Sequence, residues 1–265
     1  MMEVVLFGNP GSGKTELMKA LIQGLEGVNF VDGNVDAPQL RDIFMGKETK
    51  RDAFTIDAPF RNYMVCVSCG LCAKNCPFGA IDKVDLWIDP IECEGCGVCV
   101  EHCPQKALQM TNMQVGHVVH VENGKNNLIY GELMPGAIGG PLLVKSVREQ
   151  AKDIDTGRVS IIEAFGLGEM AVRALDGADR LVVVASERDG APFERVDSFF
   201  RGTKKFLVLN MAGSGHDEIR REVVERAKDA GYEFLFEVKE MADPNERNEA
   251  FRGLVAIFKE RVLNE

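Results

Sequence analysis

Short apolar runs alternate with amphipathic stretches along most of the chain. The apolar runs have the length of buried strands and occupy residues 3–7, 28–31, 159–162, 181–185, 206–209 and 233–237. The stretches between them predict helices at residues 16–25, 141–153, 169–175, 193–200, 217–230 and 245–263. Strands that are apolar throughout and alternate with helices are typical of α/β folds. The pattern therefore predicts a mostly parallel sheet covered by helices on both faces.

One part of the chain departs from this alternation. Residues 115–121 and 127–133 flank an Asn123-Gly124 pair, which predicts a tight β-hairpin turn. His117 and His120 lie on the first of these strands and, being three positions apart, point to opposite faces. We therefore favour ordinary surface and core roles for both over joint metal binding.

The last predicted helix is amphipathic. Its apolar side consists of Phe251, Leu254, Val255, Phe258 and Val262. Such a helix can pack on a sheet or lie on a membrane surface. Acidic residues mix with its basic ones, so packing on the sheet is favoured.

Composition narrows the classes of protein. The 265 residues suffice for one large domain, or for one domain with a small insert. The net charge of −10 disfavours nucleic acid and anionic membranes as partners. No apolar run approaches the ~20 residues that span a bilayer, and residues 1–7 suit a strand better than a signal peptide. We therefore expect a cytoplasmic protein.

A phosphate-binding motif follows the first predicted strand and precedes the first helix. It fits the pattern GxxxxGK[ST] and reads Gly8-Asn9-Pro10-Gly11-Ser12-Gly13-Lys14-Thr15. In this context the loop amides cradle a β-phosphate, Lys14 reaches the β and γ oxygens, and Thr15 binds magnesium. ATP or ADP with magnesium is the expected ligand. A glycine-rich turn that binds nothing is the disfavoured alternative.

Acidic residues follow the second predicted strand. Asp32 and Asp36 lie in the sequence Asp32-Gly33-Asn34-Val35-Asp36-Ala37-Pro38. At the carboxyl end of a parallel strand they can hold magnesium or orient water, which makes both catalytic candidates. They can equally be ordinary turn and cap residues.

All eight cysteines lie in two copies of one motif, C-x-x-C-x-x-C-x-x-x-C-P, between Cys66 and Pro104. This is the bacterial-ferredoxin pattern for two [4Fe–4S] clusters, in which the last cysteine of each motif ligates the other cluster. One predicted ligand set is Cys66, Cys69, Cys72 and Cys103. The other is Cys93, Cys96, Cys99 and Cys76.

Eight cysteines can also bind zinc or form four disulfides. Zinc sites use four ligands and rarely a third cysteine at this spacing. Four disulfides require an oxidising compartment, for which the sequence offers no secretory segment. Both are disfavoured against iron–sulfur clusters.

These motifs together resemble a known superfamily. A P-loop on the first strand, an acidic D-x-x-x-D-A-P turn after the second and a two-cluster ferredoxin inserted next are similar to the nitrogenase iron protein, MinD and Mrp dimeric ATPases, in the branch with an inserted ferredoxin. The resemblance covers essentially the whole chain. The domains expected are the first part of a P-loop NTPase at residues 1–60, the 2[4Fe–4S] ferredoxin at 61–112 and the second part of the NTPase at 113–265.

The resemblance also implies roles for residues outside the motifs. Glu163 and Gly166 stand where the family has an aspartate and a Pro-Pro-Gly switch that senses the γ-phosphate. Asn210 matches an asparagine that reads adenine. Asn9 replaces a second P-loop lysine that crosses a dimer interface, and Asn34 replaces a carboxylate. The phosphate cradle is thus intact while positions serving hydrolysis are changed. We expect slow or no hydrolysis as a homodimer, or pairing with a related, fully equipped subunit in a heterodimer.

Three functions remain open. The first is electron transfer, in which two clusters carry electrons from a redox donor to an acceptor protein and nucleotide sets the docking. The second is maturation or delivery of iron–sulfur clusters or metallocentres, as in Mrp relatives, which use a bridging C-x-x-C. No cysteine is left over here for such a bridge, which favours the first. A spatial regulator like MinD is the third.

Overall fold

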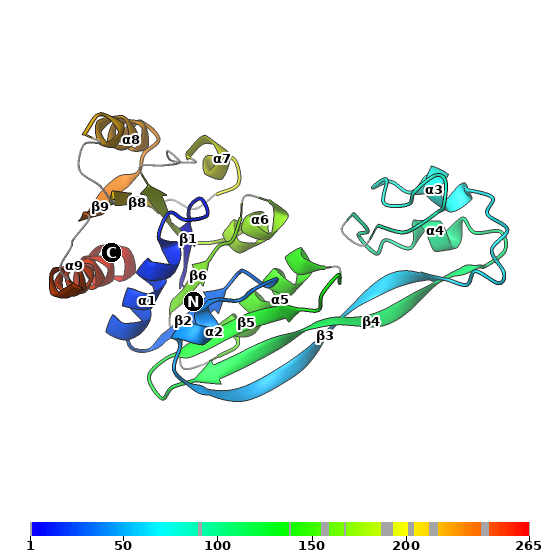
Figure 1. Ribbon diagram of the computed structural model, residues 1–265, viewed down its shortest axis with the longest axis horizontal. Helices are drawn as coiled ribbons and strands as arrows, with labels where there is room; N and C mark the ends of the chain where they lie inside the picture. Colours follow the sequence, from blue (N-terminus) through cyan, green and yellow to red (C-terminus); the bar gives the residue numbers. More distant parts are fainter. Residues whose placement is uncertain are drawn as a thin grey trace.

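The chain forms an α/β body and a long arm that ends in a small insert (Figure 1). The computed structural model describes residues 2–89, 92–137, 139–154, 159–166, 168–186, 193–200, 204–211, 217–239 and 244–264. Within these residues one nine-stranded sheet has the order β3-β4-β5-β2-β6-β1-β7-β8-β9.

The strands of the sheet divide into a parallel part and an antiparallel edge. The strands are β1 (Met2–Phe7), β2 (Val28–Asp32), β3 (Lys47–Arg61), β4 (Leu108–Glu122), β5 (Asn127–Leu133), β6 (Val159–Glu163), β7 (Arg180–Ser186), β8 (Lys204–Met211) and β9 (Glu233–Lys239). Neighbouring strands pair in parallel along the part of the sheet with the order β5-β2-β6-β1-β7-β8-β9. At the other edge, β4 pairs antiparallel with both β3 and β5. The mostly parallel sheet predicted from the sequence is confirmed.

Helices cover both faces of the sheet, as predicted. The body contains α1 (Lys14–Gly24), α2 (Leu40–Ile43), α5 (Gly140–Lys152), α6 (Glu169–Leu175), α7 (Phe193–Asp197), α8 (Asp217–Asp229), α9 (Pro244–Ile257) and a π-helix η1 (Phe258–Leu263). Successive residues of β1 point to opposite cores. Val4 and Leu6 pack with α1 and α9, while Val5 and Phe7 pack with α5 and α6.

The last helix packs on the sheet. Leu254, Phe258 and Val262 are buried in the core on the α1 side, so the packing prediction is confirmed for these residues. The side chain of Phe251 lies outside the described residues. No helix in the described part of the chain is long and apolar enough to cross a membrane.

The predicted hairpin is present as β4 and β5, joined across Asn123 and Gly124, with Glu122 opposite Asn127. His117 and His120 are half-buried on β4. The ring Nε2 of His117 lies 3.0 Å from Gln114 Nε2, and that of His120 lies 2.7 Å from Gln150 Oε1. Each therefore has an ordinary polar partner, as expected.

The arm does not follow from the sequence pattern. Strand β3 was not predicted, and β4 begins at Leu108 instead of 115. The two strands pair along their whole length to Arg61 opposite Leu108, whereas β4 pairs with β5 only from Gly116 onward. The rest projects as a two-stranded ribbon that carries the insert (Figure 1). Residues 47–61 are mostly exposed or half-buried, so they lack the apolar run that marks a buried strand.

The insert contains two short helices, α3 (Leu71–Asn75) and α4 (Val98–Glu101), and a small core of its own. That core consists of Cys72, Ala73, Ile81, Leu86, Cys99 and Leu108. The insert expected at residues 61–112 thus begins at the last residue of β3, whereas residue 112 lies within β4, which continues to Glu122.

Candidate phosphate-binding and iron–sulfur sites

The phosphate-binding motif forms a tight loop between β1 and α1. Gly13 has φ +97°, and a Cβ there would lie 2.2 Å from Asn210 Nδ2. A Cβ on Gly8 would lie 2.3 Å from the carbonyl oxygen of Val184. Only glycine therefore allows this path. Helix α1 starts at Lys14 with no side-chain cap from Gly13, so the first N–H groups face the loop, where they can bind an anion.

Lys14 and Ser12 turn polar groups into the loop. Lys14 is 6% exposed, and its Nζ donates to the carbonyl oxygens of Gly8 at 2.7 Å and Asn9 at 3.0 Å. Burial lowers the pKa of Lys14, and nearby Glu163 partly opposes this. Ser12 is 1% exposed, and its Oγ has no hydrogen-bond partner among the described residues. A buried donor of this kind fits a phosphate oxygen in the loop.

Thr15 contacts one of two carboxylates that lie opposite each other at the ends of neighbouring strands. Its Oγ1 donates to Glu163 Oε1 at 2.7 Å, and Glu163 is the register partner of Asp32 across β6 and β2. Burial, then the charge of Asp32, raises the pKa of Glu163 to about 7. Burial also raises the pKa of Asp32 to about 6, against hydrogen bonds from backbone amides. A hydroxyl and two carboxylates are oxygen ligands of the kind that magnesium prefers.

The acidic turn is held together by its own hydrogen bonds and also contains a possible metal ligand. Asp32 accepts from the amides of Asn34 and Leu40, both at 2.9 Å. Asn34 braces the turn, since its Nδ2 donates to the carbonyl oxygen of Ala37 at 2.8 Å. Asp36 is exposed, and in the described part of the chain no hydrogen bond joins it to Lys14, Thr15 or Glu163. The turn thus brings Asp32 to the site and leaves Asp36 at its edge.

Two further predicted residues lie around the loop. Asn210, near the end of β8, donates from Nδ2 to the carbonyl oxygen of Ser12 at 2.9 Å. Gly166 follows β6 with φ +71°, three residues beyond Glu163. Leu167, in the same predicted switch, lies outside the described residues.

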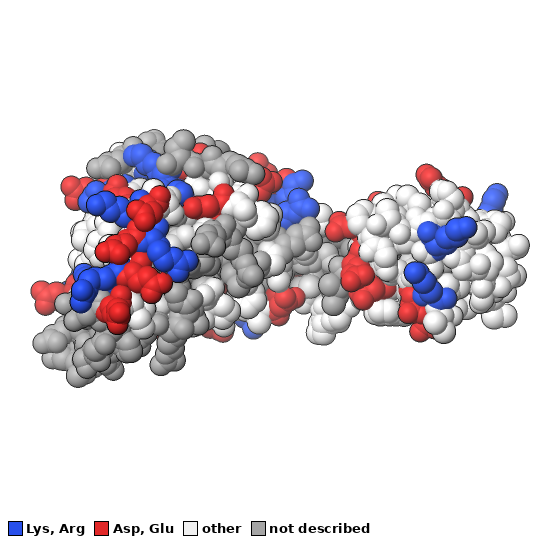
Figure 2. Space-filling view, turned by 90° about the horizontal axis from the view of Figure 1, so that it is seen from above, with Lys and Arg blue, Asp and Glu red and all other residues white. Residues whose placement is uncertain are grey.

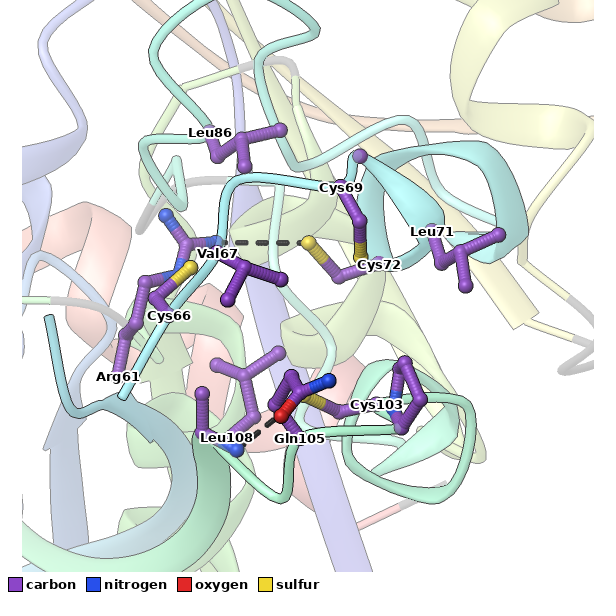
Figure 3. Close-up of a pocket in the computed structure, with 13 residues that line it drawn as sticks. Arg61, Cys66, Val67, Cys69, Leu71, Cys72, Leu86, Cys103, Gln105 and Leu108 are labelled. Carbon is purple, nitrogen blue, oxygen red and sulfur yellow. Dashed lines mark hydrogen bonds between the residues drawn. The ribbon is translucent and has the colours of Figure 1, made fainter. Parts of the chain in front are cut away.

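The eight cysteines line two cavities in the insert. The distal cavity is lined by Cys66, Cys69, Cys72 and Cys103 (Figure 3). The proximal cavity is lined by Cys76, Cys93, Cys96 and Cys99. Each cavity thus collects three cysteines from one motif and the last from the other.

The chemistry of these cavities suits a cluster. All eight cysteines are free thiols. Burial raises the pKa of Cys99 to about 11, so its thiol stays neutral until a metal displaces the proton. Among the described residues no three His, Cys, Asp or Glu side chains come close enough to share one ion. In a [4Fe–4S] cluster, by contrast, each thiolate binds a separate iron.

A buried arginine that the sequence analysis missed also fits a cluster. Arg61, at the end of β3, lines the distal cavity and is 5% exposed. Its Nη2 donates to Cys72 Sγ at 3.6 Å (Figure 3), and its Nε has no partner among the described residues. No carboxylate in the described part of the chain pairs with it. A buried cation is costly unless an anion neutralises it, and a thiolate-ligated cluster in this cavity supplies that negative charge.

Comparisons with known proteins also distinguish the insert from the body. The family model described as "4Fe-4S binding domain" matches residues 59–82 and 86–109. The region is therefore an iron–sulfur binding domain of the 4Fe–4S type. The sequence matches no curated protein.

Solved structures resemble the whole chain. Cobyrinic acid a,c-diamide synthase from Mycobacterium smegmatis, with bound ADP and magnesium, is 15% identical, covers 100% of this chain and 97% of its own, and has a TM-score of 0.50. The same enzyme with a bound ATP analogue and magnesium gives the same values. The MinC:MinD cell division complex from Aquifex aeolicus is 13% identical over 100% of this chain and 96% of its own, with a TM-score of 0.49.

The sheet order, the P-loop and this likeness define an α/β fold of the P-loop NTPase class. With the segments matched by the 4Fe–4S model, the chain has a P-loop NTPase fold that carries an inserted 4Fe–4S ferredoxin domain, as the sequence resemblance predicted.

Proposed function

We propose that the protein binds ATP and transfers electrons through two [4Fe–4S] clusters, with nucleotide state controlling dimer or partner docking. One observation carries the proposal. The two cavities, each lined by four cysteines, lie in the insert at the end of a ribbon, and the strands of this ribbon belong to the same sheet as β1, which leads into the P-loop. Clusters of this type accept and release one electron each. A nucleotide-driven change in the body could therefore act on the clusters through continuous strands.

The proposed cluster ligands are the four cysteines of each cavity. Cys103 crosses to the distal cavity and Cys76 to the proximal one. This exchange supports the crossed ligation expected from the sequence. It would hold the two clusters close together, as electron hopping between them requires.

The proposed nucleotide site is the loop between β1 and α1. Amides from Gly8 to Gly13 would hold phosphates, Lys14 would neutralise the β and γ oxygens, and Thr15 would ligate magnesium beside Glu163 and Asp32. Asn210 contacts the loop through Ser12 and remains the candidate for adenine. The M. smegmatis enzyme of similar fold binds an ATP analogue and magnesium.

Hydrolysis is proposed to be slow. Asn34 offers no carboxylate and is engaged in bracing its turn, and Asp36 lies exposed at the edge of the site. Asn9 brings no second cation to the phosphates. Turnover of the purified protein at the rate of a fully equipped ATPase, abolished by Lys14→Ala, would contradict this part of the proposal.

The surface of the insert supports docking of redox partners. Figure 2 shows charged side chains crowded over the body, whereas the insert is mostly uncharged on the face in view. Exposed apolar residues of the insert include Tyr63, Met64, Val67, Phe78, Val84 and Trp87. Apolar surface next to a redox centre favours close approach of a donor or acceptor protein.

The test is an anaerobic redox titration of purified protein with ATP, with ADP and without nucleotide. We expect about eight irons per chain, reversible reduction with the iron retained, and docking or potentials that differ between nucleotides. About four irons, or indifference to ATP analogues, would overturn the proposal.

Cluster delivery by a maturation ATPase is the second candidate. Cys69 and Cys96 are exposed, which would give an acceptor protein access to each cluster. The same material, mixed with an apo-ferredoxin as acceptor, separates the two functions. Loss of iron to the acceptor on adding ATP supports delivery, while retention through repeated reduction supports electron transfer.

A further inference from the structure

The two cavities have the same construction. Each cysteine of the first motif has a counterpart 27 positions later in the second, as Cys66 has Cys93. The members of each pair are equally exposed: Cys66 and Cys93 are half-buried, Cys69 and Cys96 exposed, Cys72 and Cys99 buried, and Cys76 and Cys103 half-buried. Ligand type and solvent exposure, two determinants of cluster potential, are therefore matched.

Charge breaks this symmetry. Arg61 lines the distal cavity, and its counterpart 27 positions later is the uncharged Ile88. Glu94 lines the proximal cavity, and its counterpart in the distal cavity is Val67. The distal cavity thus has a cation where the other has none, and the proximal cavity an anion where the other has none.

The cation is well placed to act on the distal cluster. Arg61 is buried, so its charge is poorly screened by solvent, and its Nη2 donates to Cys72 Sγ at 3.6 Å. Backbone amides donate to cysteines of both cavities, from Ala107 to Cys103 Sγ at 3.2 Å and from Gly95 to Cys93, so the amides do not distinguish the two. Hydrogen bonds and positive charge at the sulfurs stabilise the more negative, reduced cluster. Glu94 is exposed, so its opposite effect is weaker.

We propose that Arg61, opposed by Glu94 at the other cavity, gives the distal cluster a higher reduction potential than the proximal cluster. This rests on the proposed electron-transfer function. A low-potential one-electron donor protein reduces the molecule, and the electron then leaves the proximal cluster, which is reoxidised, for the distal cluster, which is reduced.

The position of the cavities gives this step a direction. Cys93 and Glu94 of the proximal cavity also line a cleft against Leu142 and Lys145 of α5, on the body. Arg61 and Leu108, the last residue pair of the ribbon, both line the distal cavity. The electron therefore comes to rest at the end of the molecule farthest along the ribbon, next to the exposed Tyr63 and Met64.

The test is an anaerobic potentiometric titration of the full chain, followed by electron paramagnetic resonance with iron content measured in parallel. Wild type should titrate in two steps. Arg61→Gln should lower the higher potential so that, at a fixed potential, the ratio of reduced to oxidised cluster falls at least tenfold, which is about 59 mV for one electron. Arg61→Lys, which keeps the charge, should restore most of the difference.

Lys106→Gln is the matched control. Lys106 is exposed between two residues that line the distal cavity, so the variant removes the same charge from the same region without desolvation. We expect a change in the ratio below threefold. A shift equal to that of Arg61→Gln would overturn the proposal, because net charge alone would then explain it.

The remaining outcomes are also decisive. Unchanged potentials in Arg61→Gln with full iron content would overturn the inference but leave electron transfer standing. A wild-type protein without reducible clusters would instead refute the proposed function. If Arg61→Gln binds less iron than wild type, Glu94→Lys provides the decisive test. This variant should raise the lower reduction potential and so narrow the difference between the two potentials. An unchanged difference would overturn the proposal.

Discussion

Glu163 lies between the residues proposed to bind magnesium and those proposed to bind phosphate. It is 7% exposed at the end of β6, accepts a hydrogen bond from Thr15 and lies opposite Asp32. Burial raises its pKa from 4.5 to about 7. At neutral pH the side chain is therefore close to half-protonated, and the proposed binding of magnesium there would release a proton.

This pKa predicts how stability depends on pH. Between about pH 4.5 and 7 the folded protein keeps a proton on Glu163 that the unfolded chain has lost. Raising the pH through this window therefore lowers the free energy of unfolding, by something on the order of 2 kcal/mol from this residue. Glu163→Gln should remove that part of the dependence, measured by urea unfolding at pH 5.5 and 7.5 without nucleotide.

Glu218→Gln is the control for this prediction, because Glu218 is an exposed carboxylate on α8. It should keep the wild-type dependence. If Glu163→Gln and wild type lost equal stability between the two pH values, Glu163 would not carry the proton.

At the scale of elements, a buried ion pair fastens α5 to β1. Arg148 donates to both carboxylate oxygens of Glu3, from Nη2 at 2.8 Å and Nε at 3.3 Å, and both residues are buried. Strand β1 leads into the P-loop, and α5 lines the cleft against the proximal cavity. The pair thus ties the strand that leads into the P-loop to the helix that faces the insert.

Breaking this pair should be costly. Arg148→Ala leaves Glu3 buried without its main partner and should lower the free energy of unfolding by about 3–5 kcal/mol. Lys152→Ala is the matched control: Lys152 Nζ also lies 3.0 Å from Glu3 Oε2 but its side chain is 47% exposed, so about 1 kcal/mol or less is expected. Denaturant unfolding at neutral pH measures both. Equal losses would mean that burial of the arginine adds nothing to the pair.

At the scale of the whole molecule, body and insert have separate cores. Within the described residues, neither body core includes a residue between 56 and 107, and the insert has its own cluster around Cys72 and Cys99. Thr55 lies opposite Gln114 across the ribbon. A two-residue Asn-Gly turn can therefore replace residues 56–113 without breaking the sheet.

The shortened chain should fold and bind nucleotide with an affinity within about threefold of the full chain, and bind no iron. Circular dichroism, calorimetry with an ATP analogue and iron analysis check these outcomes. A folded shortened chain that no longer bound nucleotide would show that the insert completes the nucleotide site, contrary to the proposed division.

Local spacing determined much of this protein. The order of Gly8, Gly13, Lys14 and Thr15 between a strand and a helix was enough to predict the loop, although Val184 and Asn210, distant in sequence, also pack against it. Cysteine spacing similarly indicated which thiols gather in each cavity, and apolar periodicity predicted the parallel strands and most helices. In each case a few consecutive residues contain the physical constraint.

Only the tertiary structure brought distant residues together. The ribbon exists because β3 pairs with β4 along its whole length, and the sequence of β3 gives no sign of which strand is its partner. The hydrogen bond from Thr15 to Glu163 and the arginine beside Cys72 depend on the same assembly. Pairing over long separations is decided by the packing of the whole chain. Only the tertiary structure therefore shows the opposite charges at the two cavities, Arg61 and Glu94, and the neighbouring carboxylates Asp32 and Glu163.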